Sequence, residues 1–139
     1  MTDEIPAGYE PPIATSPFPD YVGTIYRKEV TNAQGEKEVW SAFRIKEHHV
    51  NAWSFAHGGL MAHLSECANA SVGYEVGGPP VVAIELSTYF VRAPKLGSLL
   101  EIRAKALRRT KSLVFTEAHA FVGDELQFSS TSVQKVVGG

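Results

Sequence analysis

The chain of 139 residues is 44% hydrophobic and 10% aromatic and carries a formal net charge of −2, which fits one globular domain. That charge gives no global reason to expect nucleic acid or an anionic membrane as a partner. A single cysteine, Cys67, excludes a disulfide framework within the chain. With no signal peptide and no membrane-spanning run, we expect a cytoplasmic protein without a membrane partner.

Prolines dominate the first twenty residues, at positions 6, 11, 12, 17 and 19. Proline lacks an amide donor and fixes its own backbone, so this stretch is not expected to form regular helix or a central strand. The chain therefore divides into a proline-rich leader, residues 1–20, and a single domain, residues 21–139. Residues 21–27 are compatible either with a helix end that leads into a strand or with a strand alone.

Strand-like patterns surround one helical stretch. Residues 38–45 alternate apolar and polar side chains. Four further runs follow the helix, at residues 81–91, 99–107, 112–122 and 126–137. In the first of them, Val82, Ile84, Leu86 and Phe90 are predicted to cover the helix. One long central helix among five or six mainly antiparallel strands predicts an α+β fold in which a curved sheet wraps the helix.

The helical stretch runs from Gly58 to Tyr74, a length of about 25 Å. On a helical wheel, one mostly apolar arc is predicted to face the core: Leu60, Met61, Leu64, Cys67, Ala68, Ser71 and Val72. A second arc contains Gly59, Ala62, Glu66, Ala70 and Gly73. Glu66 is the one charged member of this lane of small side chains. Its carboxylate belongs either to a reactive site or to the edge of a tight helix–helix contact.

The glycines at positions 58 and 59 leave the first amides of this helix accessible. Such amides have no intrahelical acceptor and lie at the positive end of the macrodipole, which suits a polarised carbonyl or an oxyanion. The alternative is that the pair only eases a tight corner. Gly58 and Glu66 are about 12 Å apart along the axis, whereas reacting atoms approach to about 3–3.5 Å. If both act on one substrate, they come from two antiparallel copies.

A basic window lies between positions 92 and 111. Its seven cations are Arg92, Lys95, Arg103, Lys105, Arg108, Arg109 and Lys111, against one acid, Glu101. The window is either the solvated outer face of strands or a landing patch for an anionic group such as a nucleotide phosphate. Because aromatic side chains are not interleaved with these cations, nucleic acid is not expected.

The histidines do not predict a metal site. His48 and His49 are adjacent, and His57 and His63 are six residues apart, so neither pair has ligand spacing with a third partner. We therefore expect no metal and no cofactor. Cys67 is not expected to act as a nucleophile, because it falls in the core-facing arc without a base beside it.

The spacing of Asn51, His57-Gly58-Gly59 and an acid nine residues after the histidine resembles the hotdog-fold acyl-CoA thioesterases, most nearly the phenylacetate-degradation type. The resemblance continues through residues 82–86 and 89–97 and covers roughly residues 20 to 137. It implies the hotdog fold and hydrolysis of an acyl-CoA thioester to coenzyme A and a carboxylic acid. It also implies homodimers that assemble into tetramers, with active sites shared between two chains.

The resemblance assigns roles to individual residues. The Gly58 N–H would polarise the thioester carbonyl, and Glu66 of the neighbouring chain would act as general base on water or as a nucleophile forming a mixed anhydride. Asn51 would orient substrate or water, and His57 would anchor the loop and help at the carbonyl. The substrate-binding residues would be Gly59, Trp53, Phe55, Ala83, Arg92, Lys95, Arg108 and Arg109, the last four at the nucleotide end of coenzyme A.

The sequence departs from the phenylacetate type at a few positions. The acid there is usually Asp, whereas Glu66 resembles the related hydroxybenzoyl-CoA and enterobactin-type enzymes. Ser54 stands where a glycine is frequent, and Ala83 where some relatives carry Ser or Thr. Trp53 and Phe55 line either an acyl pocket or a subunit interface. The alternative functions are a non-catalytic acyl-CoA-binding or regulatory hotdog module and, with less support, a hotdog dehydratase.

Overall fold

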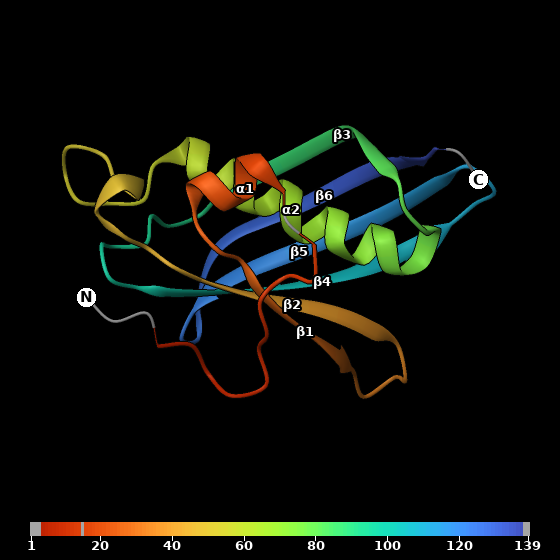
Figure 1. Cartoon of the computed structure of the whole chain (residues 1–139), viewed down its shortest axis with the longest axis horizontal. Coiled ribbons are helices and arrows are strands. Elements are labelled where there is room, and N and C mark those ends of the chain that lie inside the picture. The colour runs from red at the N-terminus through yellow and green to blue at the C-terminus, as the bar shows by residue number, and fades with distance from the viewer. Residues whose placement is uncertain (1–3, 15, 138–139) are drawn as a thin grey trace.

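One long helix lies against a six-stranded sheet (Figure 1). The computed structural model describes residues 4–14 and 16–137. The helical elements in these residues are α1 (Pro17–Val22), the 3-10 helix η1 (Glu47–His49) and α2 (Gly58–Gly77). The strands are β1 (Tyr26–Thr31), β2 (Lys37–Arg44), β3 (Val81–Phe90), β4 (Leu99–Arg109), β5 (Leu113–Val122) and β6 (Glu125–Val136).

The sheet has the order β1-β2-β4-β5-β6-β3, and all neighbouring strands are antiparallel. Along β4, Leu100 and Ile102 are buried, whereas Arg103 on the alternate face is exposed. The strands twist and curve around α2 in Figure 1. The predicted α+β fold, with one long helix wrapped by a mainly antiparallel sheet, is confirmed.

The core lies between α2 and the sheet. Leu60, Leu64 and Val72 follow one side of α2 and are buried together with Phe43 and Phe128 of the strands. Burial of each such side chain stabilises the fold by about 1.5–3 kcal/mol. This stripe decides which side of α2 faces the sheet and leaves the opposite side available for a site. None of the helices in the described residues is long and apolar enough to span a membrane.

A buried polar cluster also joins α2 to the sheet. Asn69 is fully buried, and its Nδ2 donates to the Ser65 carbonyl at 2.8 Å and to Ser130 Oγ at 3.0 Å. Its Oδ1 accepts a hydrogen bond from Thr116 Oγ1 at 2.7 Å. Buried polar groups require such partners, so these bonds fix the position of α2 along and across the strands.

The leader contains a helix that its prolines were expected to forbid, and that prediction was wrong. α1 begins at Pro17 and has Pro19 at its third position. The first amides of a helix have no intrahelical acceptor, so prolines in the first turn lose no hydrogen bond there. α1 ends at Val22 and β1 begins at Tyr26, as in the first alternative for this stretch. Positions 1–3, 15, 138 and 139 of the expected leader and domain lie outside the described residues.

Three members of the helical wheel lie elsewhere than predicted. A Cβ at Gly73 would come 1.8 Å from Gln134 Oε1, so Gly73 packs on the sheet and not in the lane. Cys67 and Ser71 are half-buried beside the lane, not in the core. The buried arc is displaced because the polar residue Asn69 is accommodated on the sheet side, which the apolar pattern alone did not indicate.

β3 forms one edge of the sheet and pairs only with β6 among the described strands. Its register shifts between Ala83 and Glu85. Val82, Ile84 and Phe90 were expected to cover the helix, yet each is at least half exposed. They remain exposed because β3 lies at the margin of the sheet. An edge strand with a free backbone side and exposed apolar side chains is suited to pairing with another strand.

Candidate active site

The start of α2 is open to solvent. His57 is the N-cap residue, and its Nδ1 accepts the N–H of Gly59 at 3.0 Å. A neutral His57 ring therefore carries its proton on Nε2. A Cβ placed at Gly58 would meet no atom within 4 Å, and the described residues provide no acceptor for the Gly58 N–H. This amide is an accessible donor at the positive end of the helix.

Asn51 shapes the loop before α2. Its Oδ1 accepts hydrogen bonds from the backbone N–H groups of Trp53 at 2.9 Å and Phe55 at 3.2 Å. Ser54 has a φ of 65°, a conformation that glycine adopts more readily. Trp53 is 77% exposed, and Phe55 forms an isolated bridge with Lys95. Since its oxygen already holds the loop, the Asn51 amide nitrogen is the group left to contact a substrate.

Glu66 lies on the wall of a cavity of about 420 Å³. His63, Cys67, Ala70 and Tyr74 of the same helix line this cavity with it. The opposite walls come from the leader, from β1 and from β2. The small Ala70 side chain leaves space next to the Glu66 carboxylate. Two members of the predicted lane, Glu66 and Ala70, therefore border a cavity, whereas Gly59, Ala62 and Gly73 do not line it.

The leader and His63 are parts of this cavity that the sequence reasoning missed. The Phe18 ring of α1 meets the His63 ring edge to face, with centroids 5.1 Å apart and an angle of 82°. His63 lies three residues before Glu66, so its place on the same side of α2 could have been read from helical periodicity. No periodic signal in the sequence places the leader over this side of the helix.

His48 and His49 hold the end of α1. Their Nε2 atoms lie 3.0 Å and 2.6 Å from the carbonyl oxygen of Val22. The Lys46 N–H donates to His49 Nδ1 at 2.9 Å, so His49 is neutral in this arrangement and donates from Nε2. Burial lowers the pKa of His49, and the charges of His48 and Lys46 act in the same direction. Within the described residues, no group of three or more His, Cys, Asp or Glu side chains could hold a metal ion.

Cys67 and His63 are neutral neighbours of Glu66. Burial raises the pKa of the Cys67 thiol to about 12, and the charge of Glu66 adds to this effect. Burial also lowers the pKa of His63, although Glu66 acts in the opposite direction. A thiol with so high a pKa is a poor nucleophile. The remaining groups of α2 at this cavity that can accept a proton are the Glu66 carboxylate and the His63 ring.

The first part of the basic window lies near the start of α2. The backbone of Lys95 forms an isolated antiparallel bridge with Phe55, in the loop that precedes α2. Arg92 Nη1 lies 3.2 Å from Glu125 Oε2. Both side chains of this ion pair are 61% exposed, so the pair is open to exchange with another anion. These two cations are therefore accessible to a ligand at this end of the helix.

The last part of the window lies at the other end of α2. Arg109 donates from Nε to the Val76 carbonyl at 3.1 Å and from Nη2 to the Gly77 carbonyl at 3.4 Å. Arg109 thus caps the end of α2, while Arg108 beside it is exposed. The 20 residues of α2 span about 30 Å. Within one chain, Arg108 and Arg109 therefore do not form one patch with Arg92 and Lys95.

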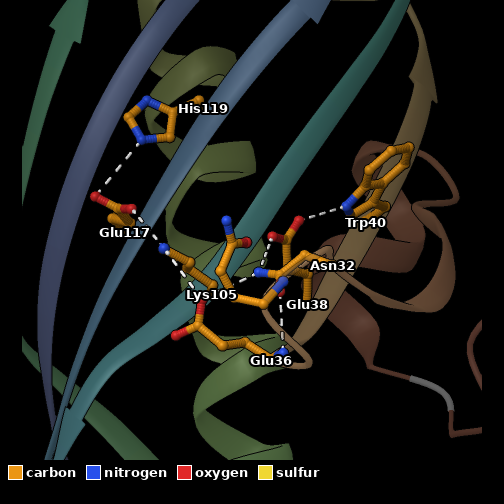
Figure 2. A network of polar contacts seen from close by, with 8 residues as sticks. Asn32, Glu36, Glu38, Trp40, Lys105, Glu117 and His119 are labelled. Atoms are coloured by element: carbon orange, nitrogen blue, oxygen red, sulfur yellow. Dashed lines mark hydrogen bonds and ion pairs between the residues drawn. The ribbon is translucent and has the colours of Figure 1, made fainter.

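The middle of the window belongs to the outer face of the sheet. Figure 2 shows Lys105 between Glu36 and Glu117, at 3.7 Å and 4.0 Å, with His119 3.6 Å from Glu117. α2 lies behind the strands in this view. Arg103 on the same face stacks on Trp40, 4.5 Å from the ring centroid. These contacts favour the interpretation as a structural outer face for Arg103 and Lys105.

Comparison with known proteins places the chain in a family. Residues 54–129, more than half of the chain, match the model of the thioesterase superfamily. The chain is 27% identical over 134 residues to a candidate esterase of Pseudomonas aeruginosa, covering 93% of this chain and 95% of that protein. A mutant of the phenylacetic acid degradation protein PaaI from Thermus thermophilus has a TM-score of 0.73 and 22% identity, covering 88% of this chain and all of that one. A hypothetical thioesterase from Streptococcus pneumoniae, solved with coenzyme A, has a TM-score of 0.68 and 19% identity. The match covers 73% of this chain and 82% of that protein's chain.

These matches, together with the sheet and the open helix start, define a hotdog-fold protein of the thioesterase class. The chain belongs to the thioesterase superfamily. The resemblance that the residues around the His-Gly-Gly sequence indicated is confirmed at the level of family and fold. By class, the protein is a thioester hydrolase.

Proposed function

We propose that this protein is an acyl-CoA thioesterase that releases coenzyme A and a carboxylic acid, with Glu66 as its base or nucleophile. The observation that carries the proposal is that the Glu66 carboxylate borders a cavity of about 420 Å³ on a helix whose first amide is unobstructed. The coenzyme A bound to the structurally similar Streptococcus pneumoniae protein supports an acyl-CoA substrate.

In this proposal the Gly58 N–H donates to the carbonyl oxygen of the thioester and stabilises the oxyanion that develops there. As a base, Glu66 removes a proton from water while the water oxygen attacks the carbonyl carbon. The tetrahedral intermediate then expels the thiolate of coenzyme A. As a nucleophile, the carboxylate would instead attack the carbonyl carbon and expel the coenzyme A thiolate, and water would hydrolyse the resulting mixed anhydride to the carboxylic acid and the free Glu66 carboxylate. Nδ2 of Asn51 would contact the water or the carbonyl, and His57 would keep the helix start in place.

The proposed site is shared by two chains. Gly58 and Glu66 are eight residues apart on one rigid helix, about 12 Å, so one chain does not bring both to one carbonyl. The exposed edge of β3, with Val82 and Ile84, supports a dimer in which two sheets join and two α2 helices lie antiparallel. Dimers would associate further into tetramers, as the family resemblance implies. Cytoplasmic localisation and the absence of a cofactor remain expectations from the sequence.

The basic residues at the two ends of α2 fit the same proposal. In an antiparallel pair of helices, the C-terminal end of one α2 lies toward the N-terminal end of the other. Arg108 and Arg109 of one chain would then approach Arg92 and Lys95 of its partner. Together they would contact the phosphates at the nucleotide end of coenzyme A.

The activity is tested first by thiol release from a panel of acyl-CoA thioesters. The wild-type protein should release thiol from at least one member, and Glu66→Gln should lower turnover by about 10²-fold or more while binding persists. Equal background rates in both proteins would contradict the proposal and favour an acyl-CoA-binding module.

The shared site is tested by mixing two inactive variants. Glu66→Gln removes the base, and Gly58→Val places a branched side chain in the open space at the helix start. In a mixed dimer, one of the two shared sites contains neither substitution. Random remixing should therefore restore about a quarter of the wild-type activity. No recovery after verified subunit exchange would refute a site built from two chains.

A further inference from the structure

Two cavities on this side of the molecule share one wall. The cavity beside Glu66 has a volume of about 420 Å³, and a second cavity, next to His57 and Gly59 at the start of α2, has about 330 Å³. Phe18 and His63 are the residues that line both cavities. We call these two rings the partition between the two spaces; the Phe18 side chain is 66% exposed.

The partition is held from both sides. Phe18 meets His63 edge to face at 5.1 Å, and Cys67 Sγ lies 3.7 Å and 3.8 Å from the two ring nitrogens of His63. Because the two distances are nearly equal, the sulfur packs against the His63 ring and does not form a single directed hydrogen bond with one nitrogen. On the leader side, Val22 lies one helical turn after Phe18, and its carbonyl is bonded by His48 and His49.

The chemistry of the partition suits an apolar ligand. Phe18 is a hydrocarbon ring, and burial favours the uncharged form of His63 by lowering its pKa. Beyond Cys67, no hydrogen-bond partner of the His63 ring is found within the described residues. An acyl group lying beside Glu66 would therefore end against two ring surfaces without a charge.

We propose that Phe18 and His63 determine which acyl groups the site accepts. The two rings stop an acyl chain that lies beside Glu66 from extending into the second cavity, so long acyl groups are excluded. This inference rests on the proposed function, since it concerns the acyl part of the thioester. The favoured substrates are compact acyl groups, aromatic or short-chain, that fit within one cavity. Opening the partition would nearly double the space that an acyl chain can reach.

The test compares the acyl-chain preference of Phe18→Ala and His63→Ala with that of the wild type. The kcat/KM is measured for straight-chain acyl-CoA thioesters of about two to twelve carbons. Each variant should raise kcat/KM for the long thioesters by about tenfold or more, since a methylene in a pocket changes it by about 10–200-fold. The kcat/KM for short thioesters should change much less. His63→Phe, which keeps a ring at the partition, should retain the wild-type preference.

Tyr21→Ala is the matched control, because Tyr21 is an aromatic residue of the same helix that is 90% exposed and lines only the second cavity. Its acyl preference should match that of the wild type. An unchanged preference in both Phe18→Ala and His63→Ala, with folded protein and active enzyme, would overturn the partition and leave the proposed function intact.

A second measurement does not depend on hydrolysis. Binding of free hexanoate and decanoate is followed by titration calorimetry in the wild type and in Phe18→Ala. A gain of about tenfold for decanoate alone would support the partition even if the wild type hydrolysed no acyl-CoA, in which case only the proposed function would fail. Equal affinities in the two proteins would overturn the partition.

Discussion

Replacement of Asn69 by alanine tests whether the buried polar cluster holds α2 on the sheet. The change removes three hydrogen bonds of 2.7–3.0 Å in a fully buried position. At about 1 kcal/mol for each bond, the free energy of unfolding should fall by about 3 kcal/mol. The Thr116 hydroxyl then keeps only the hydrogen bond that it accepts from Gln134 and has lost its own acceptor, whereas Ser130 still donates to the Ala118 carbonyl. The loss should therefore be at least this large.

The free energy of unfolding is measured by urea denaturation at one fixed protein concentration, since association would stabilise the folded state. Ser71→Ala is the control: it removes a single half-buried bond to the Ala68 carbonyl and should cost less than about 1 kcal/mol. A double-mutant cycle of Asn69→Ala with Thr116→Val should give a coupling of about 1 kcal/mol. A loss below about 1 kcal/mol for Asn69→Ala, without coupling, would refute the role assigned to the cluster.

Three further predictions follow from the helix start, the sheet edge and the leader anchor. Gly58→Ala should leave the unfolding temperature within a few degrees of the wild type, because the added Cβ meets no atom within 4 Å. The same methyl group should lower kcat/KM by about tenfold, because it blocks the approach of the thioester carbonyl to the Gly58 N–H. A wild-type kcat/KM would contradict the role of this amide. Ile84→Lys should convert the proposed dimer to a monomer in analytical ultracentrifugation, because it places a charge on the exposed β3 edge. An unchanged sedimentation coefficient would argue against this edge as the interface. Because the folded pKa of His49 is lowered, its contribution to stability is complete above about pH 6.5 and is lost as the pH falls toward the folded value. His49→Gln should therefore lose less stability than the wild type between pH 7.5 and 5.5 in urea denaturation, and parallel losses would contradict this assignment.

The fold was predictable because its signals are local and periodic. The alternation along β4 and most of the apolar stripe of α2 could be read from the sequence, because both follow from which side chains can be buried. Cys67 and Ser71 were exceptions, since neither lies in the core. The buried position of Asn69 was not predictable in this way, since its partners Thr116 and Ser130 come from strands about fifty and sixty residues further along the chain.

The candidate site was only partly predictable. Helical periodicity placed Glu66 and Ala70 on one side of α2, and both line the cavity. The larger side chains of His63 and Tyr74 line it with them, and the catalytic role of Glu66 stays a prediction. The contribution of Phe18 was missed because the prolines of the leader were interpreted as excluding a helix, although proline is well suited to a first helical turn. From its charge alone, Arg109 was expected to contact a ligand phosphate. In the structure its guanidinium donates hydrogen bonds to the carbonyl groups of Val76 and Gly77 at the end of α2.

The route of the leader has a consequence for ligand binding. Tyr9 donates to Glu101 on the outer face, Glu10 pairs with Arg27 at the β1 edge, and Phe18 reaches the cavity on the inner face. We expect a ligand that fills the cavity and packs against Phe18 to stabilise the contact of Tyr9 with Glu101 as well, since the two residues Tyr9 and Phe18 lie nine positions apart in one chain segment. Substrate would then protect the amide hydrogens of the leader from exchange, and loosening of the leader on the outer face would weaken substrate binding by the same free energy.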